Sequence, residues 1–473
     1  MTQRLLVVVA DGVRPDILAN EIDEGRAPAM ARLRERGGMF EVSSSFPSVT
    51  GPAYVPFVMG RHPAAVGMPG LRWFDRSRSL RWSLAPARSY SGIDIWQTDG
   101  DLSADFPTLF ELAQPSLAAL MIIGRGASHG RIGRGLWPSV KAAYAHFRGD
   151  LLAWRELERT TINQFMHRFE RIRPRLSMLG VLTPDKFAHA FGADCELVRE
   201  GIRDIDAAIA RAEAIAEAGG WRDTLRVWVV GDHGHAPVSN HDDLHLWLES
   251  AGHRVLAHPN VNVRRADIAL MVGGNSMAHL YLEPERRTRA EWPQLSPRWS
   301  GTLRSLMDRP SIDLAAVSIS ADRVRVHHAK RGVAEIVRSR EGDETRWTYC
   351  ANDGDPLQLG GTLHHLDADA AWEASAASDY PDALVQLSMI MTSSRSGDIV
   401  LSAAKDWDLR ARFEPTPHMS THGALLREQM MVPLIVDAPV ARRPQRTTDM
   451  VPSALEALGV DAGALQFEGR SFF

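Results

Sequence analysis

The stretch Leu5-Leu-Val-Val-Val-Ala10, followed by Asp11-Gly12, decides the fold of this chain. Its apolar residues do not alternate with polar ones, which is typical of a parallel strand buried on both faces of a sheet. The acidic residue and the glycine that follow mark the point where the strand runs into a loop. Similar short apolar runs are found at Leu120 to Ile123, Met178 to Leu182, Leu225 to Val230 and Val432 to Val436.

Between these runs lie segments in which apolar residues recur three and four positions apart, as expected of amphipathic helices. Strands that alternate with helices predict an α/β fold, with a mostly parallel central sheet flanked by helices. The helices are expected at Pro28 to Arg36, Leu151 to Arg171, Glu196 to Ala218 and Met450 to Leu458.

The pattern changes between about Ala251 and Gly397. Short alternating segments, such as Leu314 to Val326 and Gly332 to Tyr349, stand among Gly, Asp and Pro turns there. This pattern of short strands and turns predicts an inserted α+β cap. The apolar run in Asp398-Ile-Val-Leu401 is interpreted as the return to the core sheet. The expected organisation is a core of residues 1–250 and 398–473 that a cap of residues 251–397 interrupts.

The composition limits the kinds of molecule that the chain is expected to bind. The 473 residues are 44% hydrophobic and carry a formal net charge of -4, so the chain has no overall basic field for extended nucleic acid. A small-molecule partner is favoured. Cys195 and Cys350 stand far apart and form neither a disulfide framework nor a cysteine metal site. No stretch is long enough to cross a membrane, and the protein is expected in the cytoplasm.

Potential metal ligands follow several of the predicted strands, where open α/β sheets build their sites. Asp185 and His189 are four residues apart, so one helical turn brings both to the same face. Asp232 and His233 precede a glycine, which frees neighbouring side chains from strand alternation. Taken singly, each motif also suits a cap, a turn or a surface pair. As a set, Asp11, Asp185, His189, Asp232, His233 and His422 offer mixed oxygen and nitrogen ligands, which favour zinc, with manganese or iron as alternatives.

A hydroxyl that could act as a nucleophile lies in Phe46-Pro-Ser-Val-Thr50-Gly-Pro-Ala-Tyr54. The segment is predicted to form a turn that begins a helix, and a helix N-terminus presents amide groups to an anion. By itself, the segment is better explained by Thr50 as a helix N-cap. The choice between the two depends on the other motifs.

Taken in order, Asp11, Phe46-Pro-Ser-Val-Thr50, Pro184-Asp185 with His189, Asp232-His233-Gly234 and Thr421-His422-Gly423 resemble the alkaline phosphatase superfamily. The pattern is similar to its nucleotide pyrophosphatase/phosphodiesterase branch. The segment from Thr448 to Ser471 also resembles the ending of that superfamily, so the likeness covers nearly all of the chain outside the cap. The resemblance implies an alkaline-phosphatase-like core.

Carried over residue by residue, the resemblance implies two divalent metals, with zinc expected. Asp185, His189 and His422 would hold one, and Asp11, Asp232 and His233 the other. Thr50 would lie between them, attack phosphorus and form a phospho-threonine that water then hydrolyses.

The sequence departs from the family pattern just after Thr50, where Ala53 replaces the usual asparagine that binds phosphate. Another donor must therefore hold the nonbridging oxygen. The main-chain amide of Gly51, Arg72 and Asn275 are the candidates, and Arg72 with Trp73 could also stack on a base or pair with phosphate. His235 and His129 could each support a metal ligand or donate a proton, but both are expected to be solvent-facing loop residues.

The sequence thus predicts a metal-dependent phosphodiesterase or nucleotide pyrophosphatase that acts on a small organic phosphate. Two alternatives remain open. The first is a phosphomonoesterase or a hydrolase similar to phosphonoacetate hydrolase. The second is a noncatalytic metal-binding protein that keeps the same fold.

Overall fold

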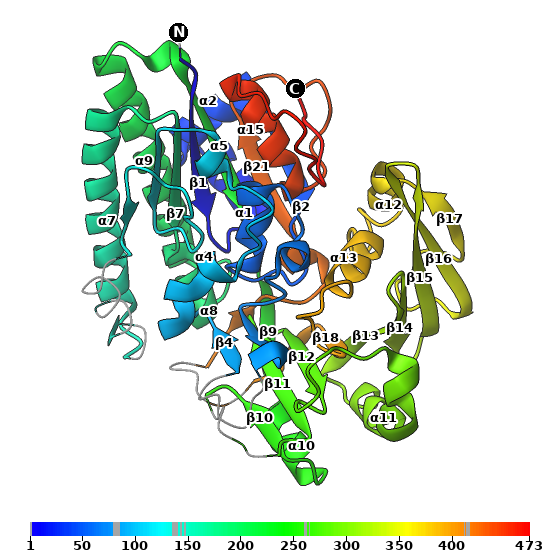
Figure 1. The fold of residues 1–473 in the computed structure, drawn as a ribbon. Coiled ribbons are helices and arrows are strands. Elements are labelled where there is room, and N and C mark those ends of the chain that lie inside the picture. Colours follow the sequence, from blue (N-terminus) through cyan, green and yellow to red (C-terminus); the bar gives the residue numbers. More distant parts are fainter. Residues whose placement is uncertain are drawn as a thin grey trace.

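The computed structural model describes residues 2–473 except 79–85, 135–140, 142–143, 146–147, 260–262, 264, 411 and 413–416. A seven-stranded sheet forms the core (Figure 1). Its central strands are parallel, whereas the two strands at one edge run antiparallel to their neighbours. In spatial order these are β2 (Gly38–Ser43), β21 (Met431–Val436), β8 (Leu225–Gly231), β1 (Arg4–Ala10), β7 (Leu176–Val181), β5 (Ser116–Ala119) and β6 (Arg131–Ile132). The predicted α/β class with a mostly parallel sheet is confirmed.

Strand β1 shows why the core is layered. Leu5, Val7 and Val9 pack into one apolar cluster, and Leu6 and Val8 into another on the opposite face. Both clusters are covered by helices, so the strand has no polar face to alternate with. One face carries α1 (Pro15–Asp23), α2 (Pro28–Arg36), α7 (Leu151–Ile172), α8 (Thr183–Phe191) and α9 (Glu196–Ala218), and the other carries α3 (Val55–Met59), α5 (Leu109–Leu112) and α15 (Met450–Leu458).

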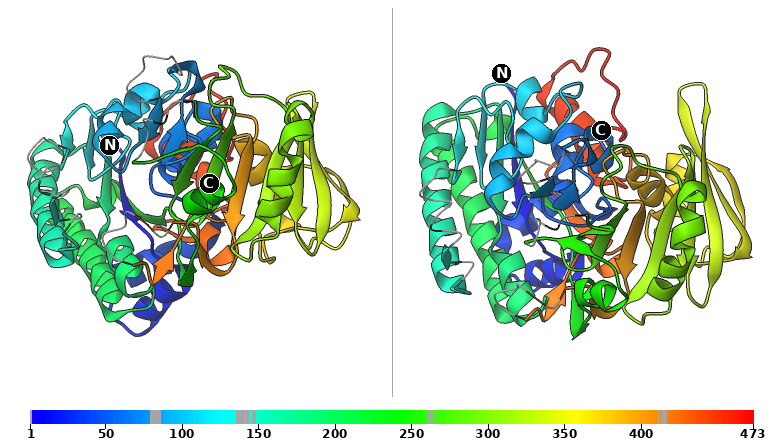
Figure 2. Two further views of the ribbon diagram at one scale, coloured as in Figure 1. Left: turned by 90° about the horizontal axis from the view of Figure 1, so that it is seen from below. Right: turned by 60° about the horizontal axis from the view of Figure 1, so that its bottom comes forward.

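A second sheet of nine strands lies beside the core. Figure 2 shows its yellow-green strands on the side of the molecule away from α7 and α9. Apart from the parallel pair β10 and β11, its strands are antiparallel. In spatial order they are β10 (Val255–Ala257), β11 (Ile268–Gly273), β12 (Met277–Leu282), β18 (Ile399–Ala403), β13 (Ile312–Ser320), β14 (Arg323–His328), β15 (Gly332–Glu341), β16 (Glu344–Gly354) and β17 (Leu363–Leu366).

Helices cover this sheet on both faces. Helix α11 (Trp292–Met307) packs on one face, while α12 (Ala368–Glu373) and α13 (Ala383–Ile390) pack on the other. The expected α+β character of the region is therefore present. The remaining elements are short. They are the strands β3 (Arg72–Phe74), β4 (Ala87–Ser89), β9 (Ala236–His241), β19 (Asp406–Asp408) and β20 (Ser420–Thr421), the helices α4 (Thr98–Asp101), α10 (Leu244–Ser250) and α14 (Arg427–Met430), and the 3-10 helices η1 (Pro52–Tyr54), η2 (Pro63–Val66), η3 (Arg76–Arg78), η4 (Ile93–Gln97), η5 (Arg222–Thr224) and η6 (Thr447–Asp449).

Two predicted core strands differ from the structure. The run at Asp398-Ile-Val-Leu401 does not return to the core sheet, because β18 pairs with β12 and β13 in the second sheet. Both faces of β18 are buried, and a buried strand has the same apolar pattern in either sheet. The run at Leu120 to Ile123 follows β5 instead of forming it, since Leu120 has a φ of 55°, which ends the strand. None of the helices in the described ranges is long and apolar enough to cross a membrane.

Candidate metal centre

Neighbouring strands of the core sheet bring the first ligands together. Strands β1 and β8 are parallel, and Ala10 lies opposite Gly231. The residues that follow, Asp11 on one strand and Asp232 with His233 on the other, therefore leave the sheet side by side. All three side chains are buried, with at most 1% of their surface exposed.

These three residues, together with Thr50, form what we call the Asp11 half of the centre. The Nε2 atom of His233 lies 3.3 Å from Asp232 Oδ2 and 3.5 Å from Asp11 Oδ1. The other oxygen of each carboxylate is held by the protein: Asp232 Oδ1 accepts from the Gly12 amide at 3.1 Å, and Asp11 Oδ2 accepts from the Tyr54 hydroxyl at 2.9 Å. Asp232 Oδ2 is buried and accepts no hydrogen bond from the described residues.

Thr50 completes the Asp11 half. Its Oγ1 atom is 3.0 Å from His233 Nε2 and 3.3 Å from Asp11 Oδ1. The turn that carries it continues through Gly51, whose φ of 102° suits glycine, into η1 and α3. The predicted turn before a helix is therefore present, and it directs the hydroxyl toward the metal ligands.

Asp185, His189 and His422 form the Asp185 half of the centre. Asp185 lies in the first turn of α8, and His189 follows one turn later on the same face. His422 comes directly after β20. Asp185 Oδ1 is 3.3 Å from His189 Nε2 and 3.5 Å from His422 Nε2, and the two Nε2 atoms are 3.1 Å apart.

Main-chain carbonyls orient the three imidazoles. The Nδ1 atom of His189 lies 3.0 Å from Ser420 O, that of His422 3.0 Å from Ser48 O, and that of His233 3.1 Å from Gly234 O. A carbonyl only accepts, so each Nδ1 carries the hydrogen. Each Nε2 then presents a lone pair to the centre, which is the arrangement of a metal-binding histidine.

The spacing of the ligand atoms fits metal ions. Around a tetrahedral zinc with bonds of about 2.0–2.1 Å, adjacent ligand atoms stand roughly 3.3 Å apart. Within each half the distances between potential ligand atoms run from 3.0 to 3.5 Å. His233 also lies 4.0 Å from Asp185 Oδ1, so the two halves adjoin. These residues could hold a metal ion in each half.

The charge of the buried carboxylates favours cations. Burial, and then the charges of Asp232 and Asp185, raise the pKa of Asp11 well above its usual range. Burial also raises the pKa of Asp232 to about 8, against the hydrogen bond from Gly12. Burial lowers the pKa of His233 to about 4, which leaves a neutral imidazole near pH 7. Divalent cations would offset the repulsion between the carboxylates.

Three neighbours of the centre were not recognised in the sequence. Glu158, from α7, accepts hydrogen bonds from the amides of Leu182 at 2.6 Å and Thr183 at 3.1 Å, and so holds the N-terminus of α8. Tyr54 holds Asp11. His235 is fully buried, so its expected solvent-facing position is wrong, whereas His129 is exposed as expected.

The candidate substrate contacts lie in different surroundings. Asn275 is close to the Asp185 half, because its backbone bridges to His422 and its side-chain amide lies 3.0 Å from His418 Nδ1. Gly51 directly follows Thr50. Trp73 is completely buried and donates from Nε1 to the Tyr90 hydroxyl, so the expected stacking on a base is wrong.

Arg72 lines a small cavity that opens to solvent. Its Nη1 atom donates to Val272 O at 3.0 Å, and Val272 lies two residues before Gly274, which touches His422. His258, Arg410 and Arg412 also line this cavity. Three arginines outnumber the single Asp243 in this lining, so the cavity is cationic. Strand β11, which contributes Leu270 and Val272 to it, ends just before Gly274, the residue that approaches His422.

The same motifs identify the family. The family model for type I phosphodiesterase / nucleotide pyrophosphatase matches residues 5–425. The chain belongs to this family. Its members are metal-dependent phosphoester hydrolases, and the predicted enzyme class is confirmed at this level. No curated protein sequence shows a significant match.

Solved structures share the fold across the whole chain. An inactive variant of murine ectonucleotide pyrophosphatase/phosphodiesterase 5, in complex with AMP, aligns over 99% of this chain and 97% of its own, with a TM-score of 0.58 and 15% identity. The human protein of that name aligns with a TM-score of 0.60, 14% identity and the same coverage. Phosphonoacetate hydrolase from Sinorhizobium meliloti, in complex with phosphonoacetate, aligns over 97% of this chain and 96% of its own, with a TM-score of 0.56 and 15% identity.

Proposed function

We propose that this chain is a two-metal phosphodiesterase or nucleotide pyrophosphatase that works through a phospho-threonine. The observation that carries the proposal is the place of Thr50. Its hydroxyl lies 3.0 Å from His233 Nε2 and 3.3 Å from Asp11 Oδ1, two of the three ligands proposed for one metal position. A noncatalytic metal site would have no use for a hydroxyl in that place.

Zinc is the metal that we expect, because aspartate oxygens and neutral histidine nitrogens suit it. Asp11, Asp232 and His233 would hold one ion, and Asp185, His189 and His422 the other. Bound there, two divalent cations would lower the pKa of the attacking hydroxyl and offset the negative charge that develops on the leaving oxygen.

The remaining steps belong to residues of the chain. The turn at Thr50-Gly51 aims Oγ1 at phosphorus, and Asp11 Oδ1 accepts the hydroxyl hydrogen, which leaves an oxygen lone pair directed outward. The bond from Oγ1 to phosphorus forms as the bond to the leaving oxygen breaks. Water then displaces Thr50 from phosphorus, and two in-line displacements give retention of configuration.

The substrate that we propose is a small organic phosphate with a second anionic or nucleotide-like group. Ala53 is buried and has no side-chain amide to offer, so the main-chain amide of Gly51, Asn275 and Arg72 are the candidate donors to phosphate oxygens. The arginines of the cationic cavity suit the second group, because guanidinium pairs well with phosphate and carboxylate.

Ala53 also supports a second candidate. Without an asparagine at this position, a phosphomonoester or a phosphonate could occupy the site as well as a diester. Murine ectonucleotide pyrophosphatase/phosphodiesterase 5 has been solved with AMP, and phosphonoacetate hydrolase with phosphonoacetate, and both share this fold.

The test is metal content by mass spectrometry together with turnover of three substrates, before and after chelation. The substrates are bis(p-nitrophenyl) phosphate, p-nitrophenyl phosphate and phosphonoacetate. We expect two metals per chain and chelator-sensitive cleavage of the diester. Bound metal with cleavage of only the monoester or the phosphonate would establish the second candidate. Less than one metal per chain would favour a noncatalytic protein.

A further inference from the structure

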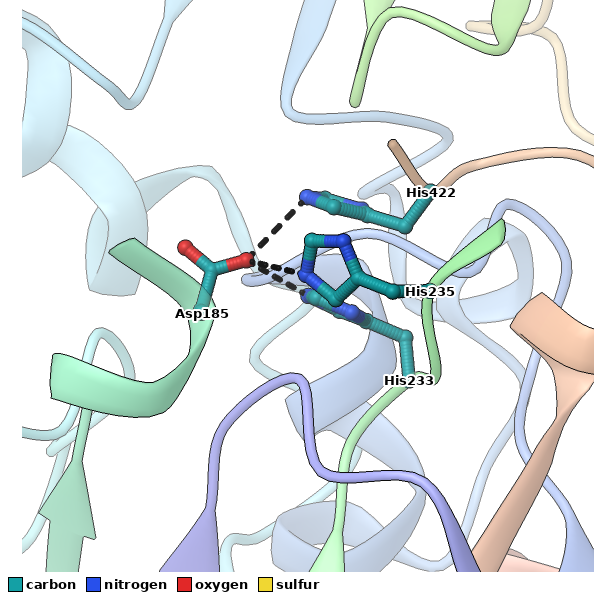
Figure 3. Close-up of side chains that lie close together, drawn as sticks. All are labelled: Asp185, His233, His235 and His422. Carbon is teal, nitrogen blue, oxygen red and sulfur yellow. Dashed lines mark hydrogen bonds and ion pairs between the residues drawn. The ribbon is translucent and has the colours of Figure 1, made fainter. Parts of the chain in front are cut away.

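His235 lies in the metal centre, although the motifs that resemble the family assign it no role. It follows His233 by two residues and is completely buried. Its Nε2 atom is 3.0 Å from Asp185 Oδ1, the same oxygen that His189 and His422 approach. Figure 3 shows the rings of His233, His235 and His422 all directing a nitrogen toward the Asp185 carboxylate.

The hydrogen on His235 can be placed from its neighbours. The Ser420 hydroxyl donates its only hydrogen to Ala188 O at 2.6 Å. Ser420 Oγ must then accept from His235 Nδ1, which lies 3.0 Å away. The hydrogen of the neutral ring is therefore on Nδ1, and Nε2 carries a lone pair.

This assignment leaves a lone pair facing an acceptor. His235 Nε2 and Asp185 Oδ1 are 3.0 Å apart, and with no hydrogen between them they repel. A cation that binds both atoms converts the repulsion into two favourable contacts. The distance also fits two ligands of one metal, because adjacent ligands of tetrahedral zinc stand roughly 3.3 Å apart.

We propose that His235 is a fourth protein ligand of the metal that Asp185, His189 and His422 hold. This inference rests on the metal centre of the proposed function and adds a residue to it. Asp185, His233, His235 and His422 offer ligand atoms that all lie within 4.8 Å of one another, and His189 joins through Asp185 and His422.

The two metal positions would then differ in kind. One carboxylate and three imidazoles fill the four positions of a tetrahedral zinc in the Asp185 half. The Asp11 half supplies two carboxylates and one imidazole, and leaves the fourth position to Thr50 or substrate. Closed sites are typical of tightly held zinc, and the metal of the Asp185 half would act on the leaving oxygen by taking a fifth ligand in the transition state, as catalytic zinc can do. The metal of the Asp185 half should therefore leave more slowly.

Zinc release to a chelator tests this difference without measuring turnover. The wild type is expected to lose its two zinc ions in separate phases, and His235→Ala is expected to speed the slower phase by at least about tenfold, a change comparable to those seen on altering metal surroundings. His241→Ala is the matched control. His241 lies at the end of β9, the strand that begins directly after His235; it is part exposed and paired with Asp408 at 3.0 Å, and its loss should leave both phases unchanged.

X-ray absorption of the wild-type zinc protein gives a second answer, which stands even if His235→Ala does not fold. With His235 as a ligand, four imidazoles serve two zinc ions, an average of two for each. Without it, three imidazoles serve two ions.

The outcomes separate the two claims. A protein that binds two zinc ions and cleaves phosphoesters, but has three imidazoles for two ions and an unchanged slow phase in His235→Ala, would keep the proposed function and overturn the role of His235. His235 would then be a charged hydrogen-bond donor to Asp185. A protein that binds no zinc, manganese or iron would overturn both.

Discussion

The Asp11 half and the Asp185 half of the metal centre have similar ligands but are built in different ways. The Asp11 half comes from the ends of β1 and β8, which are hydrogen-bonded neighbours in one sheet. The Asp185 half joins helix α8 to His422, which follows β20 beside the second sheet. Backbone pairing inside one sheet thus positions the first half, whereas the second depends on backbone contacts between segments that are distant in the sequence.

Replacing Thr50 should have the largest effect on activity, because it removes the attacking hydroxyl. The metal ligands remain in place, so the variant distinguishes loss of attack from loss of metal. Thr50→Ala is expected to lower kcat by at least about 10⁴-fold, as the loss of a nucleophile does elsewhere. Thr50 is partly exposed, so stability should change by no more than about 1 kcal/mol. Steady-state kinetics with metal analysis would measure both. A variant that kept most of its activity would show that water, rather than threonine, attacks phosphorus.

Removing one carboxylate from each half should break the centre one metal at a time. Asp232→Asn is expected to lose the metal of the Asp11 half and Asp185→Asn that of the Asp185 half, each with a fall in activity of more than about 100-fold. Metal content per chain by mass spectrometry measures this. Loss of both metals in either variant would mean that the two halves depend on each other to bind metal.

Glu158, which holds the N-terminus of α8 in the Asp185 half, should make the stability of the protein depend on pH. Burial raises the pKa of this carboxyl from 4.5 to about 7. Its contribution to stability is therefore fully present below pH 4.5 and is lost as the pH rises through 7. Since one pKa unit is about 1.4 kcal/mol, the loss amounts to at most about 3 kcal/mol.

Glu158→Gln keeps an acceptor for the Leu182 amide and removes this titration. The free energy of unfolding of the wild type, relative to this variant, should fall between pH 4.5 and pH 8. Urea denaturation at several pH values measures the difference. A difference that stayed constant with pH would show that Glu158 titrates normally.

Removing the hydrogen bond from Tyr54 to Asp11 should have a smaller effect, and this effect should be on metal affinity rather than on protein stability. Tyr54→Phe removes the hydroxyl that donates to Asp11 Oδ2, and we expect about tenfold weaker binding of one metal. Tyr90→Phe is the control, because Tyr90 is also buried and donates to a carboxylate, that of Asp101, outside the centre. Equal metal affinity in both variants would show that the Asp11 orientation does not depend on Tyr54.

The sequence predicted the Asp11 half more directly than its surroundings. A polar residue directly after a buried apolar run can be placed at a sheet edge, and Asp11, Asp232 and His233 follow that rule. The environment of His235 cannot be obtained in this way, because Ser420, which covers it, belongs to a segment far along the chain. No local pattern indicates that contact.

The errors in the fold have the same origin. The apolar pattern of β18 shows that the strand is buried but not which sheet buries it. Trp73 lies in a segment rich in glycine and arginine that resembles a surface loop, yet its ring packs in the core and its indole nitrogen pairs with Tyr90. In both cases the partner is set by tertiary structure, which periodicity does not report.

The separation of His422 from the other ligands has a consequence for biosynthesis. The Asp11 half is complete in the nascent chain once His233 has been made, whereas the Asp185 half must wait for His422, 189 residues later. At about 5–20 residues per second, translation needs roughly 10–40 s to cover that interval. The second sheet is synthesised within it. A ribosome-bound chain can thus offer one metal position while the other does not yet exist. The Asp11 half can therefore bind its ion before the Asp185 half does.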